Sequence, residues 1–214
     1  LYGLAYSIGM LVQLFISGMN SALTPWMYSK IKKGDIRSMR KVLQLLSIVV
    51  VGIAVALMLI SPELVLIFGS PKYREAVYVI PPVAASVFFI FIYNILSMPQ
   101  FYYEKTQFLM AASMAAAGAN VVLNFIFIRL FGYIAAGYTT LACYMLYSVG
   151  HYIVSKRILV NEGIQENLMN PGFLLACSVF LIGASIICNL IFPYRILRYA
   201  ILLASAGLVF WKKE

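Results

Sequence analysis

Apolar residues occur along this chain in continuous runs rather than in alternation with polar ones. Seven such runs lie at residues 1–28, 42–60, 78–103, 108–128, 133–154, 173–192 and 196–211. A helix needs roughly 20 residues to cross about 30 Å of hydrocarbon, whereas a membrane β-barrel needs alternating segments of about ten residues. The pattern therefore predicts an all-α polytopic membrane protein with about seven transmembrane helices.

The composition supports a membrane protein. The chain is 63% hydrophobic and 11% charged, with a mean hydropathy of +0.93, whereas about a quarter of the residues in a soluble domain are charged. A single core of 214 residues could not bury so much apolar surface, because a folded protein leaves much of its surface exposed. These values exclude an ordinary soluble domain.

The loops between the runs fall on two sides, and the basic residues favour one of them. That side carries 11 Lys and Arg, in segments 30–41, 104–107, 155–172 and 212–214. The other side carries five, at Lys72, Arg74, Arg129, Arg195 and Arg198. Cytoplasmic loops hold the excess of Lys and Arg, so Gly34, Lys156 and the C-terminus are predicted in the cytoplasm and Ser70 outside.

Segment 30–41, KIKKGDIRSMRK, concentrates six basic residues beside one acid, Asp35. We interpret it as a topology-fixing loop that also contacts anionic membrane lipids. Nucleic acid is not an expected partner, because aromatic residues are not interleaved with the charges and no soluble domain presents them.

Enzyme chemistry finds little support in the sequence. The seven acids are placed in loops with no pair at helical spacing inside a run, so no catalytic residue is predicted. The three cysteines lack metal-ligand spacing, and no metal or cofactor is expected. His151, the single histidine, lies near the cytoplasmic end of its run and is predicted as an interface residue or helix-end cation rather than a proton relay.

Uncharged polar residues recur at helical spacing in three of the runs. These stripes comprise Gln13, Ser17, Asn20 and Thr24; Asn120 and Asn124; and Thr140, Tyr144, Tyr147 and His151. Because lipid cannot satisfy polar groups, a stripe faces either another helix or water. Interhelical hydrogen bonding explains any one residue equally well. Two long stripes in different helices favour a shared hydrated cavity, and hence a carrier.

Four segments in order and spacing carry a resemblance to a known family. They are SALTPWMYSKIKKGD, FGSPKYREAVYVIPPVA, YYEKTQ and ANVVLNFIFIRLFGYIAAGYTTLACY. The series resembles the second half of bacterial polysaccharide flippases, the O-antigen and capsule repeat-unit translocases of the multidrug/oligosaccharidyl-lipid/polysaccharide exporter superfamily. The resemblance covers residues 1–155, as a partial C-terminal lobe of about five helices. Residues 156–214 resemble the family by hydropathy alone, as two additional C-terminal helices.

The resemblance implies a fold and a function. The family has about fourteen helices in two lobes with both termini cytoplasmic, and these runs would be the eighth to fourteenth, leaving the first lobe outside this sequence. The implied activity is to flip undecaprenyl-diphosphate-linked oligosaccharide units across the bacterial inner membrane by alternating access, with other polysaccharide-assembly proteins as partners. Three basic residues, Lys30, Lys32 and Lys33, are candidates for gathering the diphosphate at the cytoplasmic mouth.

Three other functions stay open. A multidrug–cation antiporter of the same superfamily should bury a carboxylate for cation coupling, and none is predicted within a run. A lipid II flippase shares the architecture and differs chiefly in its cavity charges. A non-transporting scaffold subunit of a polysaccharide-assembly complex belongs to a different class, and only the polar stripes argue against it.

Overall fold

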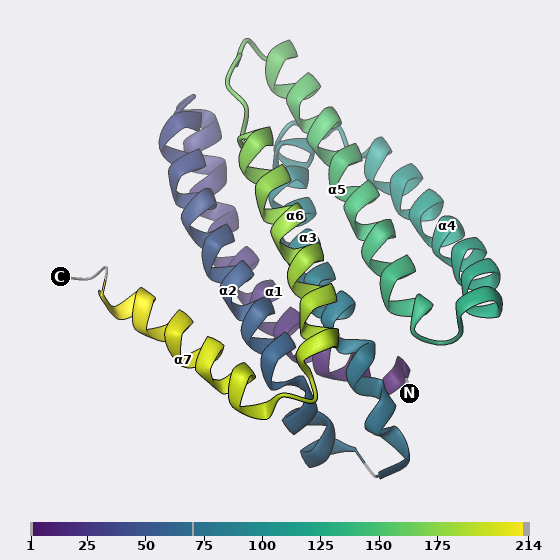
Figure 1. The fold of residues 1–214 in the computed structure, drawn as a ribbon. Coiled ribbons are helices and arrows are strands. Elements are labelled where there is room, and N and C mark those ends of the chain that lie inside the picture. The colour runs from purple at the N-terminus through teal and green to yellow at the C-terminus, as the bar shows by residue number, and fades with distance from the viewer. Residues whose placement is uncertain (1, 70, 212–214) are drawn as a thin grey trace.

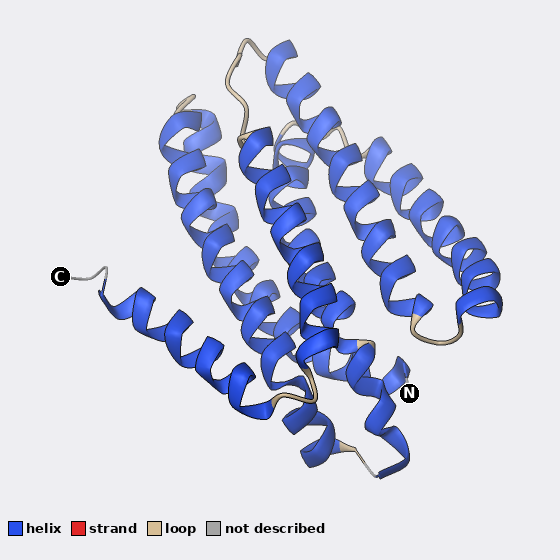
Figure 2. Cartoon of the chain, in the orientation of Figure 1, coloured by secondary structure: helices blue, strands red, loops and turns tan. Residues whose placement is uncertain are grey.

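The residues that the structure describes fold into seven α-helices and one 3₁₀-helix (Figure 1). The computed structural model describes residues 2–69 and 71–211. The helices are α1 (Tyr2–Lys32), α2 (Ile36–Phe68), η1 (Pro71–Tyr78), α3 (Ile80–Tyr102), α4 (Gln107–Phe131), α5 (Ala135–Asn161), α6 (Pro171–Ile191) and α7 (Arg195–Trp211). Within the described residues the chain is 88% helical and contains no strand (Figure 2). The predicted fold class is confirmed.

Each predicted run coincides with one helix, but not every helix is a candidate span. Five helices are long and apolar enough to cross a membrane: α1, α2, α3 with part of η1, α4 and α6. The α5 helix has 27 residues but a more polar composition, and α7 has only 17 residues. The seven expected spans therefore correspond to seven helices. Two of these do not qualify as candidate spans, α5 because it is too polar and α7 because it is too short.

Helix α3 forms the centre of the bundle, with α1, α2, α5 and α6 packed around it (Figure 1). Nearly every residue of α3 is buried, including the large side chains of Phe88, Phe91 and Ile95. A helix that is hydrophobic on all faces is typical of such a buried position. Pro81 and Pro82 stand at its first turn, where the missing N–H groups would have no partner within the helix.

Two glycines let neighbouring helices approach α3 closely. A Cβ atom added to Gly137 on α5 would lie 2.7 Å from the Pro82 side chain, and one added to Gly9 on α1 would lie 2.8 Å from Val83. Both distances are shorter than van der Waals contact. Small residues allow this close packing of helix backbones, which drives association where lipid competes for apolar surface.

The basic segment 30–41 is a tight turn between two helices rather than a long loop. Gly34 adopts φ +67°, which favours glycine, and the Asp35 amide donates to the Lys30 carbonyl across the end of α1. The Asp35 carboxylate then caps α2 by accepting from the Ser38 amide. Hydrogen bonding from the Lys30 ammonium lowers the pKa of Asp35.

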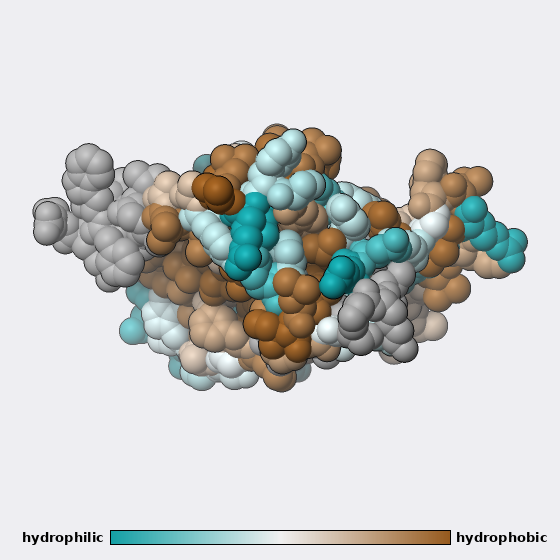
Figure 3. All heavy atoms as spheres, turned by 60° about the horizontal axis from the view of Figure 1, so that its bottom comes forward, coloured by the Kyte–Doolittle hydropathy of each residue, from teal (hydrophilic) through white to brown (hydrophobic). Residues whose placement is uncertain are grey.

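The connections alternate between the two ends of the bundle (Figure 1). The α1–α2, α3–α4 and α5–α6 connections lie at the upper end, where Arg40 pairs with Glu166 and Lys105 with Glu162. The opposite end shows only narrow hydrophilic patches on a largely hydrophobic surface (Figure 3). The three more basic connections therefore share one end of the bundle, as expected, whereas α7 runs obliquely from the opposite end and stops short of the upper end (Figure 1). Leu1, Ser70 and the segment 212–214 lie outside the described residues.

Helix α2 corrects the expectation that all acids lie in loops. It continues through Pro62 to Phe68, because the Ser61 hydroxyl donates to the Met58 carbonyl (2.8 Å), which proline leaves without its helical partner. Glu63 therefore lies inside a helix that is a candidate span. The sequence pattern does not show this, because the apolar run stops at residue 60.

A buried ion pair joins Glu63 to α7. Arg198 donates from its two terminal nitrogens to the two Glu63 oxygens, at 2.8 and 2.9 Å, and also to the Leu59 carbonyl at 2.7 Å. The Tyr199 hydroxyl donates to the same carboxylate at 2.9 Å. The Arg198 side chain is only 4% exposed and that of Glu63 is 24% exposed. This planar, two-point contact fastens the short α7 helix to α2.

Replacing Arg198 by Met should destabilise the protein more than replacing its exposed neighbour Arg195 by Met. Removing one partner of a buried pair leaves an uncompensated charge, and the loss should be about 3 kcal/mol, at the low end of the usual range because Glu63 keeps some exposure. Thermal unfolding in lipid nanodiscs measures the difference. The double change Glu63→Gln with Arg198→Met should recover part of the loss, and equal effects of the two Arg variants would contradict the assignment.

Candidate functional site

Two of the predicted polar stripes meet in one pocket between α3, α4 and α5. The pocket has a volume of about 550 Å³. Its polar lining consists of Tyr93, Ser113, Asn120, Thr140, Tyr144 and Tyr147. Its remaining walls are Ala116, Ala117, Val121 and Cys143. We call this the tyrosine pocket; none of its lining residues is charged.

Side-chain hydrogen bonds fix the α4 wall of the tyrosine pocket against α5. The hydroxyls of Ser113 and Tyr147 lie 2.8 Å apart. Asn124, one turn from Asn120, donates to the side-chain Oδ1 of Asn120 at 2.9 Å and accepts from the Thr139 hydroxyl at 2.6 Å. Asn124 therefore orients a pocket residue instead of lining the pocket itself, and Thr139 is an addition to the predicted set.

Aromatic rings form the α3 side of the tyrosine pocket. Tyr93 stacks parallel to Tyr144 with ring centroids 6.2 Å apart, and meets Tyr147 edge-on at 4.8 Å. The sequence prediction does not include Tyr93, although Tyr93, Ser97 and Gln100 recur in this run at intervals of four and three, the spacing that marks the other polar stripes. The pocket thus offers hydroxyl and amide groups beside aromatic faces.

The α1 stripe does not line the tyrosine pocket. Asn20 is buried and Thr24 half-buried, with the Thr24 hydroxyl donating to the Asn20 backbone carbonyl at 2.8 Å and lying 3.7 Å from the Met98 sulfur of α3. Gln13 is half-buried and Ser17 is exposed. The structure therefore brings the α4 and α5 stripes together and keeps the α1 stripe apart. A transport role for these four residues stays a prediction.

The three candidate basic residues at the cytoplasmic mouth have different surroundings. Lys30 is half-buried and bonded to Asp35 and Ser38. Lys32 and Lys33 are exposed, and neither takes part in an ion pair among the described residues. Lys32 and Lys33 therefore remain available to an anionic group, whereas Lys30 is engaged in the turn.

His151 is not the interface residue or helix-end cation that its position predicts. It is completely buried (0% exposed), and its Nδ1 lies 2.8 Å from Nε2 of Gln100 on α3. The expectation is wrong because the distance from the helix end, measured along α5, ignores the neighbouring helices. The side chain points at α3, where Gln100 is also fully buried. No sequence signal links Gln100 to His151.

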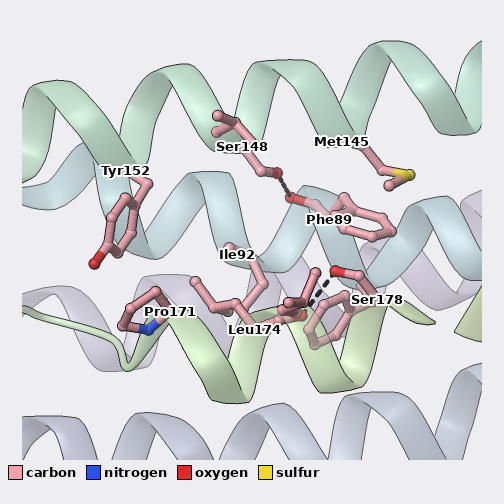
Figure 4. Close-up of a pocket in the computed structure, with 11 residues that line it drawn as sticks. Phe89, Ile92, Met145, Ser148, Tyr152, Pro171, Leu174 and Ser178 are labelled. Carbon is pink, nitrogen blue, oxygen red and sulfur yellow. Dashed lines mark hydrogen bonds between the residues drawn. The ribbon is translucent and has the colours of Figure 1, made fainter. Parts of the chain in front are cut away.

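A second pocket, which we call the apolar groove, lies between α3, α5 and α6 (Figure 4). Its volume is about 270 Å³, and Phe89, Ile92, Met145 and Leu174 are among its walls. The hydroxyls of its two serines are engaged by backbone: Ser148 donates to the Phe89 carbonyl at 3.0 Å, and Ser178 donates within its own helix. This groove therefore suits hydrocarbon and not a sugar or a phosphate.

Comparison with known proteins identifies one family. The MatE family matches residues 1–126, which is more than half of the 214-residue chain and runs from α1 into α4. No curated protein and no solved structure gives a significant match. The division into a lobe at residues 1–155 and two additional helices at 156–214 stays a prediction.

Proposed function

The chain belongs to the MatE family of the multidrug/oligosaccharidyl-lipid/polysaccharide exporter superfamily, and from this premise we propose that it serves the export of lipid-linked oligosaccharides. MatE members are transporters rather than enzymes, and the chain is a multi-pass membrane protein. The proposed substrate is an undecaprenyl-diphosphate-linked repeat unit, moved from the cytoplasmic to the periplasmic leaflet of the bacterial inner membrane for O-antigen, capsule or exopolysaccharide synthesis. Alternating access would expose the binding site to each side in turn.

The observation that carries this proposal is the chemistry of the tyrosine pocket. A sugar presents many hydroxyl groups that both donate and accept hydrogen bonds, and the pocket supplies the Asn120 amide and the hydroxyls of Thr140 and Tyr147. It supplies no charge that a neutral sugar would have to desolvate. A lipid-facing helix would have no use for such a lining, because polar groups in hydrocarbon are costly. This argues against the scaffold alternative.

The multidrug–cation alternative requires an acid that can release a proton or bind a cation. Among the described residues, the candidate spans contain two carboxylates. That of Glu75 lies in η1 at the end of its span, is exposed and accepts from the Tyr133 hydroxyl. That of Glu63 accepts hydrogen bonds from Arg198 at both its oxygens. A carboxylate neutralised in this way is a poor cation site. The tyrosine rings would suit an organic cation, but the pocket lacks the acid that cation coupling needs. The lipid II alternative shares a diphosphate-linked substrate and stays open.

No Lys or Arg lines the tyrosine pocket, so the diphosphate must contact another part of the transporter. Lys32 and Lys33, exposed at the end of α1, supply one such contact in this proposal. Their charge would attract the anionic head group at the cytoplasmic surface, where the potential of basic segments acts over about 8–10 Å. The oligosaccharide would then enter the uncharged pocket.

Replacing Asn120 by Leu together with Thr140 by Val should reduce polysaccharide export at least tenfold. The pair removes hydrogen-bonding groups from the tyrosine pocket and leaves its volume similar. The changes are made in the full-length protein, expressed in a strain that lacks its own flippase, and surface polysaccharide is measured at equal membrane abundance. Ser148→Ala is the matched control, since it removes a buried hydroxyl of the same helix that does not line the tyrosine pocket.

The same export measurement tests the α1 stripe with a second variant and also tests the tyrosine pocket itself. The variant Gln13→Leu with Asn20→Leu should keep most export if these residues only join helices, since each contact is worth about 0.6 kcal/mol. Loss of export would add the stripe to the substrate path. Near-normal export by the Asn120/Thr140 variant would remove the tyrosine pocket from the proposal.

The proposed orientation places the C-terminus in the cytoplasm, as the bias in basic residues indicates. Lys33→Cys should resist a membrane-impermeant thiol reagent in intact cells, and Arg74→Cys should react, with the native cysteines replaced. Both side chains are exposed, and Lys33 is preferred to Gly34, whose positive φ disfavours a side chain. Reaction at position 33 but not at position 74 would invert the orientation.

A further inference from the structure

Three aromatic rings from three helices surround the His151 imidazole. The ring centroids of Tyr147, Phe108 and Tyr93 lie 4.5, 5.3 and 5.9 Å from that of the imidazole. Tyr93 belongs to α3, Tyr147 to α5, and Phe108 to the first turn of α4. Aromatic rings within about 6 Å stabilise a cation, above all where water is excluded. Burial disfavours a charged imidazolium, and the three rings offset part of that cost.

The hydrogen bond to Gln100 defines a neutral state of the histidine. An amide nitrogen only donates, so Gln100 Nε2 donates to Nδ1, and the imidazole proton resides on Nε2. Two buried polar atoms then lack a partner: Nε2 of His151 and Oε1 of Gln100. An unsatisfied acceptor next to an imidazole nitrogen is costly in a site without water. The unpaired Oε1 is able to accept from an N–H at Nδ1, which both the imidazolium and the other neutral tautomer carry; the imidazolium differs in keeping the proton on Nε2 as well.

We propose that His151 is a proton-binding site and that its protonation rotates the side-chain amide of Gln100. The new charge then alters the part of the tyrosine pocket that Tyr93 and Tyr147 form. The incoming proton adds to Nδ1. The Gln100 amide then rotates so that its Oε1 accepts a hydrogen bond from Nδ1–H. The hydrogen bond between Gln100 and the imidazole is thereby kept, with its direction reversed. Nε2 of Gln100, which also donates to the Leu96 carbonyl at 3.3 Å, moves away from the imidazole. This rotation gives up the long hydrogen bond to the Leu96 carbonyl. The one covalent bond formed is the N–H bond at Nδ1, and the positive charge lies among the three rings.

The link to the tyrosine pocket runs through shared side chains. Tyr93 and Tyr147 contact the imidazole and also line the pocket, and the Tyr147 hydroxyl is bonded to Ser113 of α4. A charge on His151 therefore acts on two pocket walls at once. The proton site rests on geometry alone; only its use in export rests on the proposed function.

The groups that face His151 carry no full charge. From α3 they are Tyr93 and Gln100, from α4 Phe108, and from α5 itself Tyr147. The two tyrosines are the titratable members. No carboxylate or basic side chain takes part in the hydrogen bonds and ring contacts of His151 in the described structure. The imidazole is thus the group that changes charge here.

The test measures protonation of His151 by NMR of protein labelled with ¹⁵N-histidine in lipid nanodiscs, with signals assigned by their loss in His151→Gln. We expect the neutral Nε2–H tautomer at pH 7.5 and reversible protonation on acidification while the protein stays folded. Gln100→Glu should move the titration midpoint up by about 1–3 pH units, because a carboxylate beside the imidazole favours its charged form. Signals unchanged by pH down to about 4 in both proteins would overturn the proposal and leave a structural histidine.

A second variant keeps the test decisive if Gln100→Glu does not fold. Phe108→Leu removes one ring from the half-exposed start of α4 and should lower the titration midpoint by about half a pH unit. An unchanged midpoint would show that the rings do not support the charge, and would overturn the assignment of the enclosure.

Coupling to the tyrosine pocket is tested separately from export. With native cysteines replaced, the thiol modification rate of Asn120→Cys is compared at pH 7.5 with Gln100 and with Gln100→Glu, and Ser178→Cys in the apolar groove is the control. We expect at least a threefold change at position 120 and none at position 178. Equal rates at position 120 would overturn the coupling, whether or not the protein exports polysaccharide.

Discussion

The close contact of α5 with α3 is the feature on which the site depends. Gly137 brings the start of α5 against Pro82, so that the two helices meet at a distance that any larger residue would prevent. From that contact α5 runs beside α3. Farther along it, the Ser148 hydroxyl donates to the Phe89 carbonyl, and His151 is hydrogen-bonded to Gln100. The tyrosine pocket opens on one flank of this pair and the apolar groove on the other.

Charged and uncharged polar groups occupy different parts of this bundle. The ion pair of Glu63 and the buried Arg198 lies near the end of α2, and its two charges neutralise each other. The middle of the bundle instead holds amides, hydroxyls and one imidazole. Because an unpaired charge in hydrocarbon costs several kcal/mol while a hydrogen-bonded amide costs little, this distribution keeps a polar pocket at low energetic cost.

The sequence predicts the helices well and their mutual contacts poorly. The length of each apolar run is set by the bilayer, so the runs alone locate all seven helices. Helical period also places Asn120, Thr140, Tyr144 and Tyr147 on common faces, and they do line one pocket.

Periodicity fixes a residue only relative to its own helix. It therefore does not show that Tyr93 and Gln100 of α3 face the polar residues of α5, although both share a helical face with Ser97. The same limit explains the two errors, at Glu63 and at His151. The apolar run ends before Glu63, although Ser61 and Arg198 satisfy carbonyls near Pro62 and allow the helix to continue. In both cases a side chain from a distant segment changes what a local pattern means.

Helix α4 is the wall of the tyrosine pocket that is held least firmly. None of its described residues is buried, and it packs chiefly on α5. Its polar contacts to α5 are the Ser113–Tyr147 and Asn124–Thr139 hydrogen bonds, each worth about 0.6 kcal/mol in a membrane. Moving α5 would break its close packing on α3, whereas moving α4 would break these two bonds, the contact of Phe108 with His151 and the packing of α4 on α5. The size of the pocket is therefore set by the position of α4 against a rigid α3–α5 pair.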